Sequence, residues 1–130
     1  MARLDLEKNA LGADGVAALA ASDTLAAVES LDLSRNDLGA EGARQLAAAS
    51  LPALETLHLS GNSLGDEGAV ALAAASGMPR LKGAMLTWNR IGVKGARAIA
   101  GAEIFDCTHE TNIWGKAVAR GHVPRVTGRA

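Results

Sequence analysis

Hydrophobic and polar residues alternate in short stretches that recur along the chain. Stretches such as LDLSRN at 31–36 and LHLSGN at 57–62 place two leucines two positions apart, with a polar residue between them. A period of two is typical of a strand with one buried face. We therefore expect each stretch to begin with a short strand whose leucines lie in the core.

A helical pattern follows each predicted strand. In LGAEGARQLAAAS, at 38–50, apolar or small residues recur three and four positions apart, as at Ala43, Leu46 and Ala47. Most residues of this segment favour helix, and glycines punctuate the turn before it. Each unit is therefore predicted to be a strand, a turn and a helix, which is close to the minimum for a parallel crossover.

Four asparagines show that the unit is repeated. Asn9, Asn36, Asn62 and Asn89 are separated by 27, 26 and 27 residues. Alignment on them brings apolar residues into register five before, three before, two after and ten after, and glycines into register three and six after. Ala84 is the exception in the first of these leucine columns, and we expect it to leave the fourth unit less tightly packed.

Repetition of this unit predicts an α/β solenoid. One unit cannot bury its apolar strip alone, but stacked units bury a continuous core between a parallel sheet and a layer of helices. Strands repeat every ~4.8 Å, whereas packed helices need about 8–10 Å, so the helix layer forms the longer arc. The sheet is therefore expected on the concave side and the helices on the convex side.

The pattern LxxLxLxxNxLGxxG resembles the ribonuclease-inhibitor-like class of leucine-rich repeats, which also occurs in NOD-like receptors and in the Ran GTPase-activating protein. Residues 4–100 carry the resemblance in four motifs: LDLEKNALGADG, LDLSRNDLGAEG, LHLSGNSLGDEG and AMLTWNRIGVKG. The resemblance implies a horseshoe-like arc that binds a protein partner on its concave face. It also implies a structural role for the four asparagines, whose side-chain amides would bind backbone groups of the turns.

The pattern fades after residue 100, which suggests two regions. Residues 1–100 are predicted to form four repeats without an N-terminal cap, and we interpret them as a truncated or partial array. Residues 101–130 are predicted to form a degenerate repeat or C-terminal cap, in which Trp114 covers the core end, followed by a basic tail. The tail carries Lys116, Arg120, Arg125 and Arg129.

The positions between the strand leucines point away from the core and differ from unit to unit. The central column consists of Asp5, Asp32, His58 and Met85, and a flanking column consists of Glu7, Ser34, Ser60 and Thr87. Variation on a repeating framework indicates a partner-binding face at Asp5, Asp32, His58, Met85, Ser34, Ser60 and Thr87. The alternative is that repeat surfaces vary freely when nothing selects them.

Trp88 is a further candidate for partner binding. It immediately precedes Asn89, at a position where the other units carry Lys8, Arg35 and Gly61. An exposed tryptophan at the edge of the sheet would be a suitable anchor, because tryptophan is enriched in binding hot spots. The alternative is that Trp88 folds over the last unit as part of the cap.

Charge and composition narrow the functional classes. The chain of 130 residues has 13 basic and 14 acidic residues, a balance that argues against a surface tuned to nucleic acid or to an anionic membrane. Cys107 is the single cysteine, so no intrachain disulfide framework exists. The sequence contains no signal peptide pattern and no apolar run of membrane-spanning length, and we predict a soluble, cytoplasmic protein.

Candidate chemistry is sparse. Cys107 and His109 would share one face of a strand, as in half of a metal or nucleophile site, but no second pair of such ligands stands near. There is no Walker-type loop, GxSxG elbow or HExxH motif. We therefore expect no catalytic residue, metal ion, cofactor or small-molecule substrate. Two alternatives to a binding module are a GTPase regulator, in which Arg35 or Arg90 would act on the bound GTPase, and a non-functional repeat remnant.

Overall fold

The computed structural model describes residues 2–101. Strands and helices alternate along the chain, with one short 3-10 helix (η1) after the first α-helix. The elements are β1 (Arg3–Asp5), α1 (Gly12–Ala20), η1 (Asp23–Ala27), β2 (Ser30–Asp32), α2 (Gly39–Ala47), β3 (Thr56–His58), α3 (Gly65–Ala73), β4 (Gly83–Met85) and α4 (Val93–Gly101). We number the repeats as units 1 to 4, which begin with β1 to β4 at residues 3, 30, 56 and 83.

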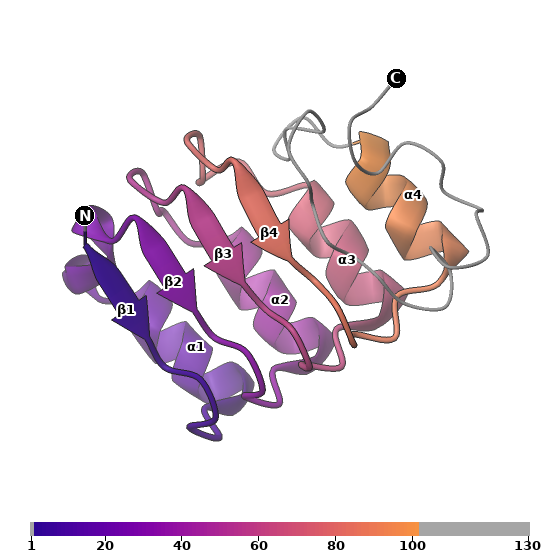
Figure 1. The fold of residues 1–130 in the computed structure, drawn as a ribbon, viewed down its shortest axis with the longest axis horizontal. Helices are drawn as coiled ribbons and strands as arrows, with labels where there is room; N and C mark the ends of the chain where they lie inside the picture. The colour runs from indigo at the N-terminus through magenta and orange to yellow at the C-terminus, as the bar shows by residue number, and fades with distance from the viewer. Residues whose placement is uncertain (1, 102–130) are drawn as a thin grey trace.

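The strands form one parallel sheet in the order β1-β2-β3-β4, with the helices in a second layer behind it (Figure 1). Pairing is in exact unit register: Leu4 lies beside Leu31, Leu31 beside Leu57, and Leu57 beside Ala84. Each helix packs against the helix of the next unit. The predicted α/β leucine-rich solenoid is therefore confirmed.

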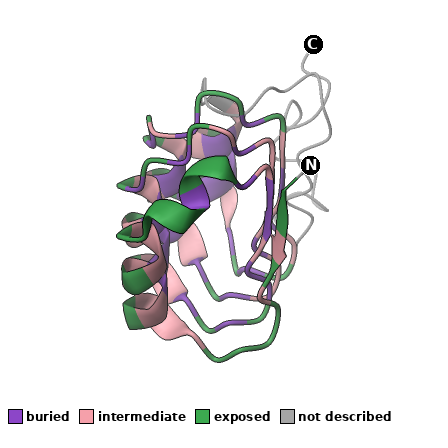
Figure 2. Cartoon of the chain, turned by 90° about the vertical axis from the view of Figure 1, so that its left-hand side faces the viewer, coloured by how far each residue is buried: buried purple, intermediate pink, exposed green. Residues whose placement is uncertain are grey.

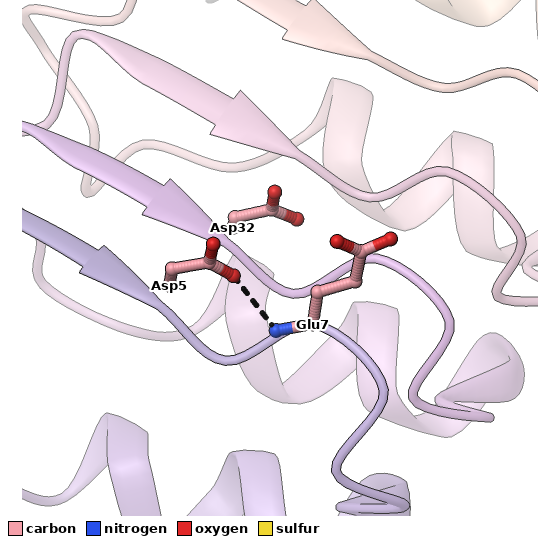
Figure 3. A group of neighbouring side chains, drawn as sticks. All are labelled: Asp5, Glu7 and Asp32. Atoms are coloured by element: carbon pink, nitrogen blue, oxygen red, sulfur yellow. Dashed lines mark hydrogen bonds between the residues drawn. The ribbon is translucent and has the colours of Figure 1, made fainter.

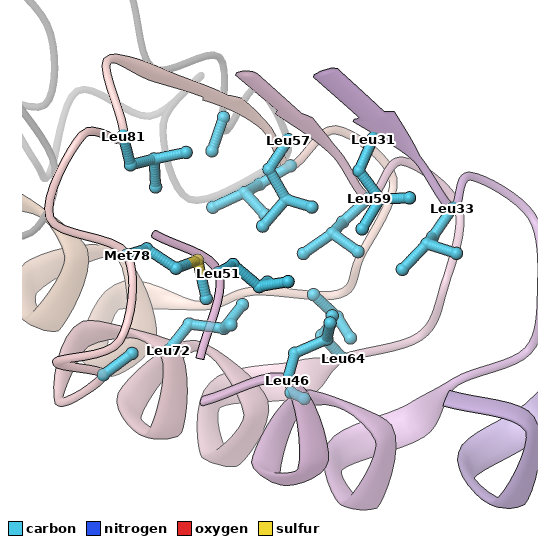
Figure 4. Close-up of a cluster of buried hydrophobic side chains, with 14 of the residues drawn as sticks. Leu31, Leu33, Leu46, Leu51, Leu57, Leu59, Leu64, Leu72, Met78 and Leu81 are labelled. Carbon is cyan, nitrogen blue, oxygen red and sulfur yellow. The ribbon is translucent and has the colours of Figure 1, made fainter. Parts of the chain in front are cut away.

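The core lies between the two layers and is built mainly from leucine (Figure 4). Strand leucines such as Leu31 and Leu33 meet helix leucines such as Leu46, and all three are almost completely buried. Small alanines on the inner faces of the helices let the two layers approach closely. Ala84 is also buried, and the looser packing that we expect of unit 4 stays a prediction.

The 3-10 helix η1 was not expected from the sequence. Ser22 precedes it, and its hydroxyl accepts a hydrogen bond from the Thr24 N–H. Leu25 of η1 is buried, as are Leu51 and Met78 at the equivalent points of units 2 and 3. In those two units proline follows the buried residue, whereas unit 1 has alanine, which can continue a helical turn.

Unit 1 is the least buried part of the described chain. Leu4 and Leu6 are half-buried, whereas the equivalent Leu31 and Leu33 of unit 2 are fully buried.

Within residues 2–101, no helix is both long enough and apolar enough to cross a membrane.

We predict that Leu33→Ala lowers the free energy of unfolding by about 2–5 kcal/mol, because it removes a fully buried side chain and leaves a cavity. Leu6→Ala, at the same position of unit 1, should cost clearly less, because solvent already reaches Leu6. Urea denaturation of both variants checks this. Equal costs would contradict the burial difference between the two units.

Candidate functional site

Three of the four asparagines form a buried ladder between units. Asn36 and Asn62 are completely buried, and Asn89 is 2% exposed. The Oδ1 of Asn36 accepts hydrogen bonds from the Asn9 N–H (2.8 Å) and the Leu11 N–H (3.3 Å) of the preceding unit. Its Nδ2 donates to the Leu6 carbonyl of that unit (2.8 Å) and to the Leu33 carbonyl of its own (3.0 Å).

The ladder repeats at each step. The Oδ1 of Asn62 accepts from the Asn36 N–H at 2.8 Å, and the Oδ1 of Asn89 accepts from the Asn62 N–H at 2.7 Å. Asn62 Nδ2 also donates to the Leu33 carbonyl, and Asn89 Nδ2 to the Leu59 carbonyl. Each amide thus joins two adjacent turns, which is the structural role that the resemblance implied.

The residues on either side of each asparagine adopt left-handed backbone. All eight have positive φ: Lys8, Ala10, Arg35, Asp37, Gly61, Ser63, Trp88 and Arg90. Left-handed backbone costs a residue other than glycine about 1–2 kcal/mol. The asparagine hydrogen bonds offset this cost, because they hold the turn that ends each strand. Residue types do not reveal this strain, since only Gly61 in these columns is glycine.

The outward side chains of the sheet form what we call the strand face: Asp5, Asp32, His58 and Met85 in the central column and Glu7, Ser34, Ser60 and Thr87 beside it. The central residues lie side by side across the strands, from Asp5 to Asp32 to His58 to Met85. All four are exposed or half-buried.

The flanking column is less accessible than the central one. Ser34 is only 8% exposed, so a partner could reach little of it. The hydroxyls of Ser60 and Thr87 hydrogen-bond to each other at 2.8 Å, and both residues are half-buried. The accessible part of the column is therefore concentrated at Glu7.

Three carboxylates converge at the unit 1 end of the strand face (Figure 3). Asp5, Glu7 and Asp32 each have an oxygen within 4.8 Å of the other two. Asp5 also accepts a hydrogen bond from the Glu7 N–H (3.0 Å), and Asp32 accepts one from the Ser34 N–H (2.9 Å). Among the described residues, no lysine or arginine makes an ion pair with any of the three.

This acidic cluster offers oxygen ligands of the kind that Ca²⁺ or Mg²⁺ takes. Those ions need about six or more oxygens, and the cluster supplies carboxylates from only three side chains, two of them exposed. We treat the cluster as a negatively charged surface and not as a metal centre.

Trp88 lies at the opposite end of the same layer and is 82% exposed. The interpretation of Trp88 as an anchor stays a prediction, because the predicted cap lies beyond residues 2–101. Arg35 and Arg90 are also exposed, at left-handed positions of the turns. The predictions for Cys107, His109, Trp114 and the basic tail lie outside the described residues.

A family model described as Leucine Rich repeat matches residues 2–20, 27–47, 51–73 and 86–100. The chain belongs to the leucine-rich repeat family. Each match falls mainly on one of the four units of this leucine-rich repeat protein. A comparison with curated proteins found no match. Leucine-rich repeats are in general a non-enzymatic interaction fold, which is consistent with the scarcity of candidate chemistry.

We predict that Asn36→Ala lowers the free energy of unfolding by about 1–3 kcal/mol. The substitution leaves backbone N–H and carbonyl groups of two turns buried without their hydrogen-bond partner. Thermal or urea unfolding measures the loss. Ser34→Ala, a nearby substitution at the same strand end, serves as the control, since the hydrogen bonds of Ser34 within residues 2–101 use its backbone and not its hydroxyl. A loss no larger than that of the control would contradict the ladder's role.

Proposed function

We propose that this leucine-rich repeat protein is a non-enzymatic binding module that holds a protein partner on its strand face. One observation supports this most strongly. The acidic cluster lies at the β1–β2 end of the sheet, and Trp88, which is 82% exposed, lies in the turn after β4 at the other end. Charged groups without a cation partner and an exposed aromatic ring are the features that a partner would neutralise and cover.

The distance between the acidic cluster and Trp88 suggests how far apart the partner's contacting groups would lie. From β1 to β4 the sheet spans three strand spacings, about 14 Å. An extended segment crosses that distance in about four to five residues. The partner would therefore place a basic group over Asp5, Glu7 and Asp32, and an apolar group against Met85 and Trp88.

We also propose that the units belong to the ribonuclease-inhibitor-like class. Repeats of 26 and 27 residues, each with a regular α-helix opposite its strand, support this assignment. This assignment rests on the LxxLxLxxNxLGxxG pattern, which also suggested the class from the sequence.

We predict that Asp32→Arg combined with His58→Glu abolishes partner binding and lowers the unfolding temperature only slightly, through loss of the hydrogen bond from the Ser34 N–H to Asp32. Both side chains are half-buried on the strand face and carry no part of the core. The matched control is Asp14→Arg combined with Ala18→Glu, which makes the same charge changes at exposed positions of α1. Affinity capture from lysate, followed by titration of the captured partner, compares the wild type with both variants.

The two variants make the result decisive. A partner that is retained by the wild type and by the α1 variant, and lost by the strand-face variant, supports the proposal. If the captured partner binds the strand-face variant as tightly as the wild type, the strand face is not the binding surface.

We predict that Trp88→Arg weakens binding of the same partner at least tenfold without changing stability, because an aromatic hot-spot residue typically carries more than about 1.4 kcal/mol of binding free energy. Arginine occupies the equivalent left-handed position at Arg35, so the fold accepts it. Isothermal titration measures the affinity. An unchanged affinity would remove Trp88 from the proposed face and leave the acidic cluster to be tested alone.

A further inference from the structure

The formal charge changes sign along the array. Residues 3–29 of unit 1 carry two basic and five acidic side chains, a charge of −3, and residues 30–55 of unit 2 carry two basic and four acidic side chains, a charge of −2. Residues 56–82 of unit 3 carry two of each, and residues 83–101 of unit 4 carry three basic side chains and no acidic one. The charge balance of the whole chain therefore conceals a gradient from one end of the sheet to the other.

The acidic side of this gradient is accessible to solvent. The acidic side chains of unit 1 lie at exposed positions, except for the half-buried Glu29 (Figure 2 looks onto this unit and colours exposed residues green). Asp5 and Glu7 of this unit belong to the acidic cluster.

The basic side chains of unit 4 follow the exposed Trp88 in the chain. Arg90 stands two residues after Trp88 in the same turn, and Lys94 and Arg97 lie three residues apart on α4, at neighbouring positions of its surface. All three are exposed, and none makes an ion pair with a carboxylate of residues 2–101. We call Trp88, Arg90, Lys94 and Arg97 the basic end.

The acidic side chains of unit 3 do not neutralise the basic end. The Oδ1 of Asp66 accepts hydrogen bonds from the Gly92 N–H (2.6 Å) and the Gly95 N–H (2.9 Å), so this carboxylate binds backbone groups at the start of α4. Glu67 pairs with Arg44 of unit 2 at 3.2 Å. The cations of the basic end are therefore available to an anionic group from outside the array.

The neighbouring unit leaves Trp88 accessible. The equivalent position of unit 3 is Gly61, which carries no side chain, and the Cγ of Arg35 from unit 2 lies 3.2 Å from the point where a Cβ at Gly61 would stand. Trp88 is accordingly 82% exposed. A ligand can contact this ring and the cations that follow it in the chain at the same time.

A uniformly charged polymer does not match the whole gradient. A nucleic acid strand laid along the sheet would be attracted by the basic end and repelled by units 1 and 2, because its phosphates carry one sign of charge throughout. A protein segment can change sign along its length, and electrostatic complementarity of that kind fixes the orientation of a complex. A segment that carries a basic group, then an apolar group, then an acidic group matches the array from β1 to the turn after β4.

We propose that the basic end is a docking surface for an acidic stretch of the protein partner, with an apolar residue of that stretch against Trp88. This inference rests on the proposed function and deepens it. With the partner's basic group over the acidic cluster and its acidic group at Arg90 and Lys94, the charge gradient determines which way round the partner lies. The test below uses defined peptides and no captured partner, so its failure is distinct from failure of the strand-face variant.

The test follows the Trp88 indole N–H resonance of the full chain by NMR, assigned by its absence from Trp88→Arg. The two probes are the capped peptides Gly-Leu-Glu-Glu and Gly-Leu-Lys-Lys, which share the apolar residue and differ in the sign of their charge. At low ionic strength, the glutamate peptide should reach half of its maximal shift at an about tenfold lower concentration than the lysine peptide. The difference should shrink as salt is added, because exposed charges are screened.

A charge-reversed variant ties this preference to the basic end. Arg90→Asp combined with Lys94→Glu should reverse the order of the two peptides. Aspartate occupies the equivalent left-handed position of unit 2 at Asp37, so the fold accepts it there. If this variant does not fold, Lys94→Glu combined with Arg97→Glu, both at exposed positions of α4, should at least halve the preference.

The matched control is Arg3→Glu combined with Lys8→Asp, which makes the same charge change at exposed positions of unit 1 and includes one left-handed residue. It should leave the order of the peptides unchanged. The inference is overturned if the two peptides act at equal concentrations on the natural chain, or if the unit 1 control reverses their order as well. A short oligothymidylate that shifts the Trp88 resonance at a lower concentration than the glutamate peptide also overturns it, and would assign the basic end to nucleic acid.

Discussion

The asparagine ladder holds each turn of the array to the next. Every unit must turn its chain away from the sheet within a few residues, and that turn carries buried N–H and carbonyl groups that helix and sheet do not satisfy. One asparagine amide can accept and donate at once, so it satisfies groups of its own turn and of the preceding turn. The same side chain therefore stabilises both the packing of adjacent units and the turn that follows each strand.

The residues that stabilise the fold differ from the residues that are available to contact a partner. Leucines and asparagines supply the burial and the hydrogen bonds, and they recur in every unit. The positions between them contribute little to the core, so Asp32, His58 and Met85 can differ in charge and size without disturbing the strands beneath. A strand face of this kind can change its chemistry without a change in architecture.

Periodicity was enough to predict the fold, because leucine spacing and the asparagine columns report directly on burial. It predicted the strands, the helices and the register across the sheet. It could not predict the left-handed residues beside each asparagine, because Lys8 and Trp88 are not the residue types that usually mark such backbone. It also placed Asp5 and Asp32 in one column, but the approach of Glu7 depends on the turn after β1, which brings its N–H to the Asp5 carboxylate.

The half-buried first unit has a consequence for how binding and folding are coupled. Within residues 2–101, unit 1 is the least buried unit, so we expect it to open before the others when the array fluctuates. The acidic cluster spans units 1 and 2, so it exists only while unit 1 stays closed. A ligand held by all three carboxylates would draw part of its binding free energy from keeping that unit closed, and local breathing at this end would set how long the complex lasts.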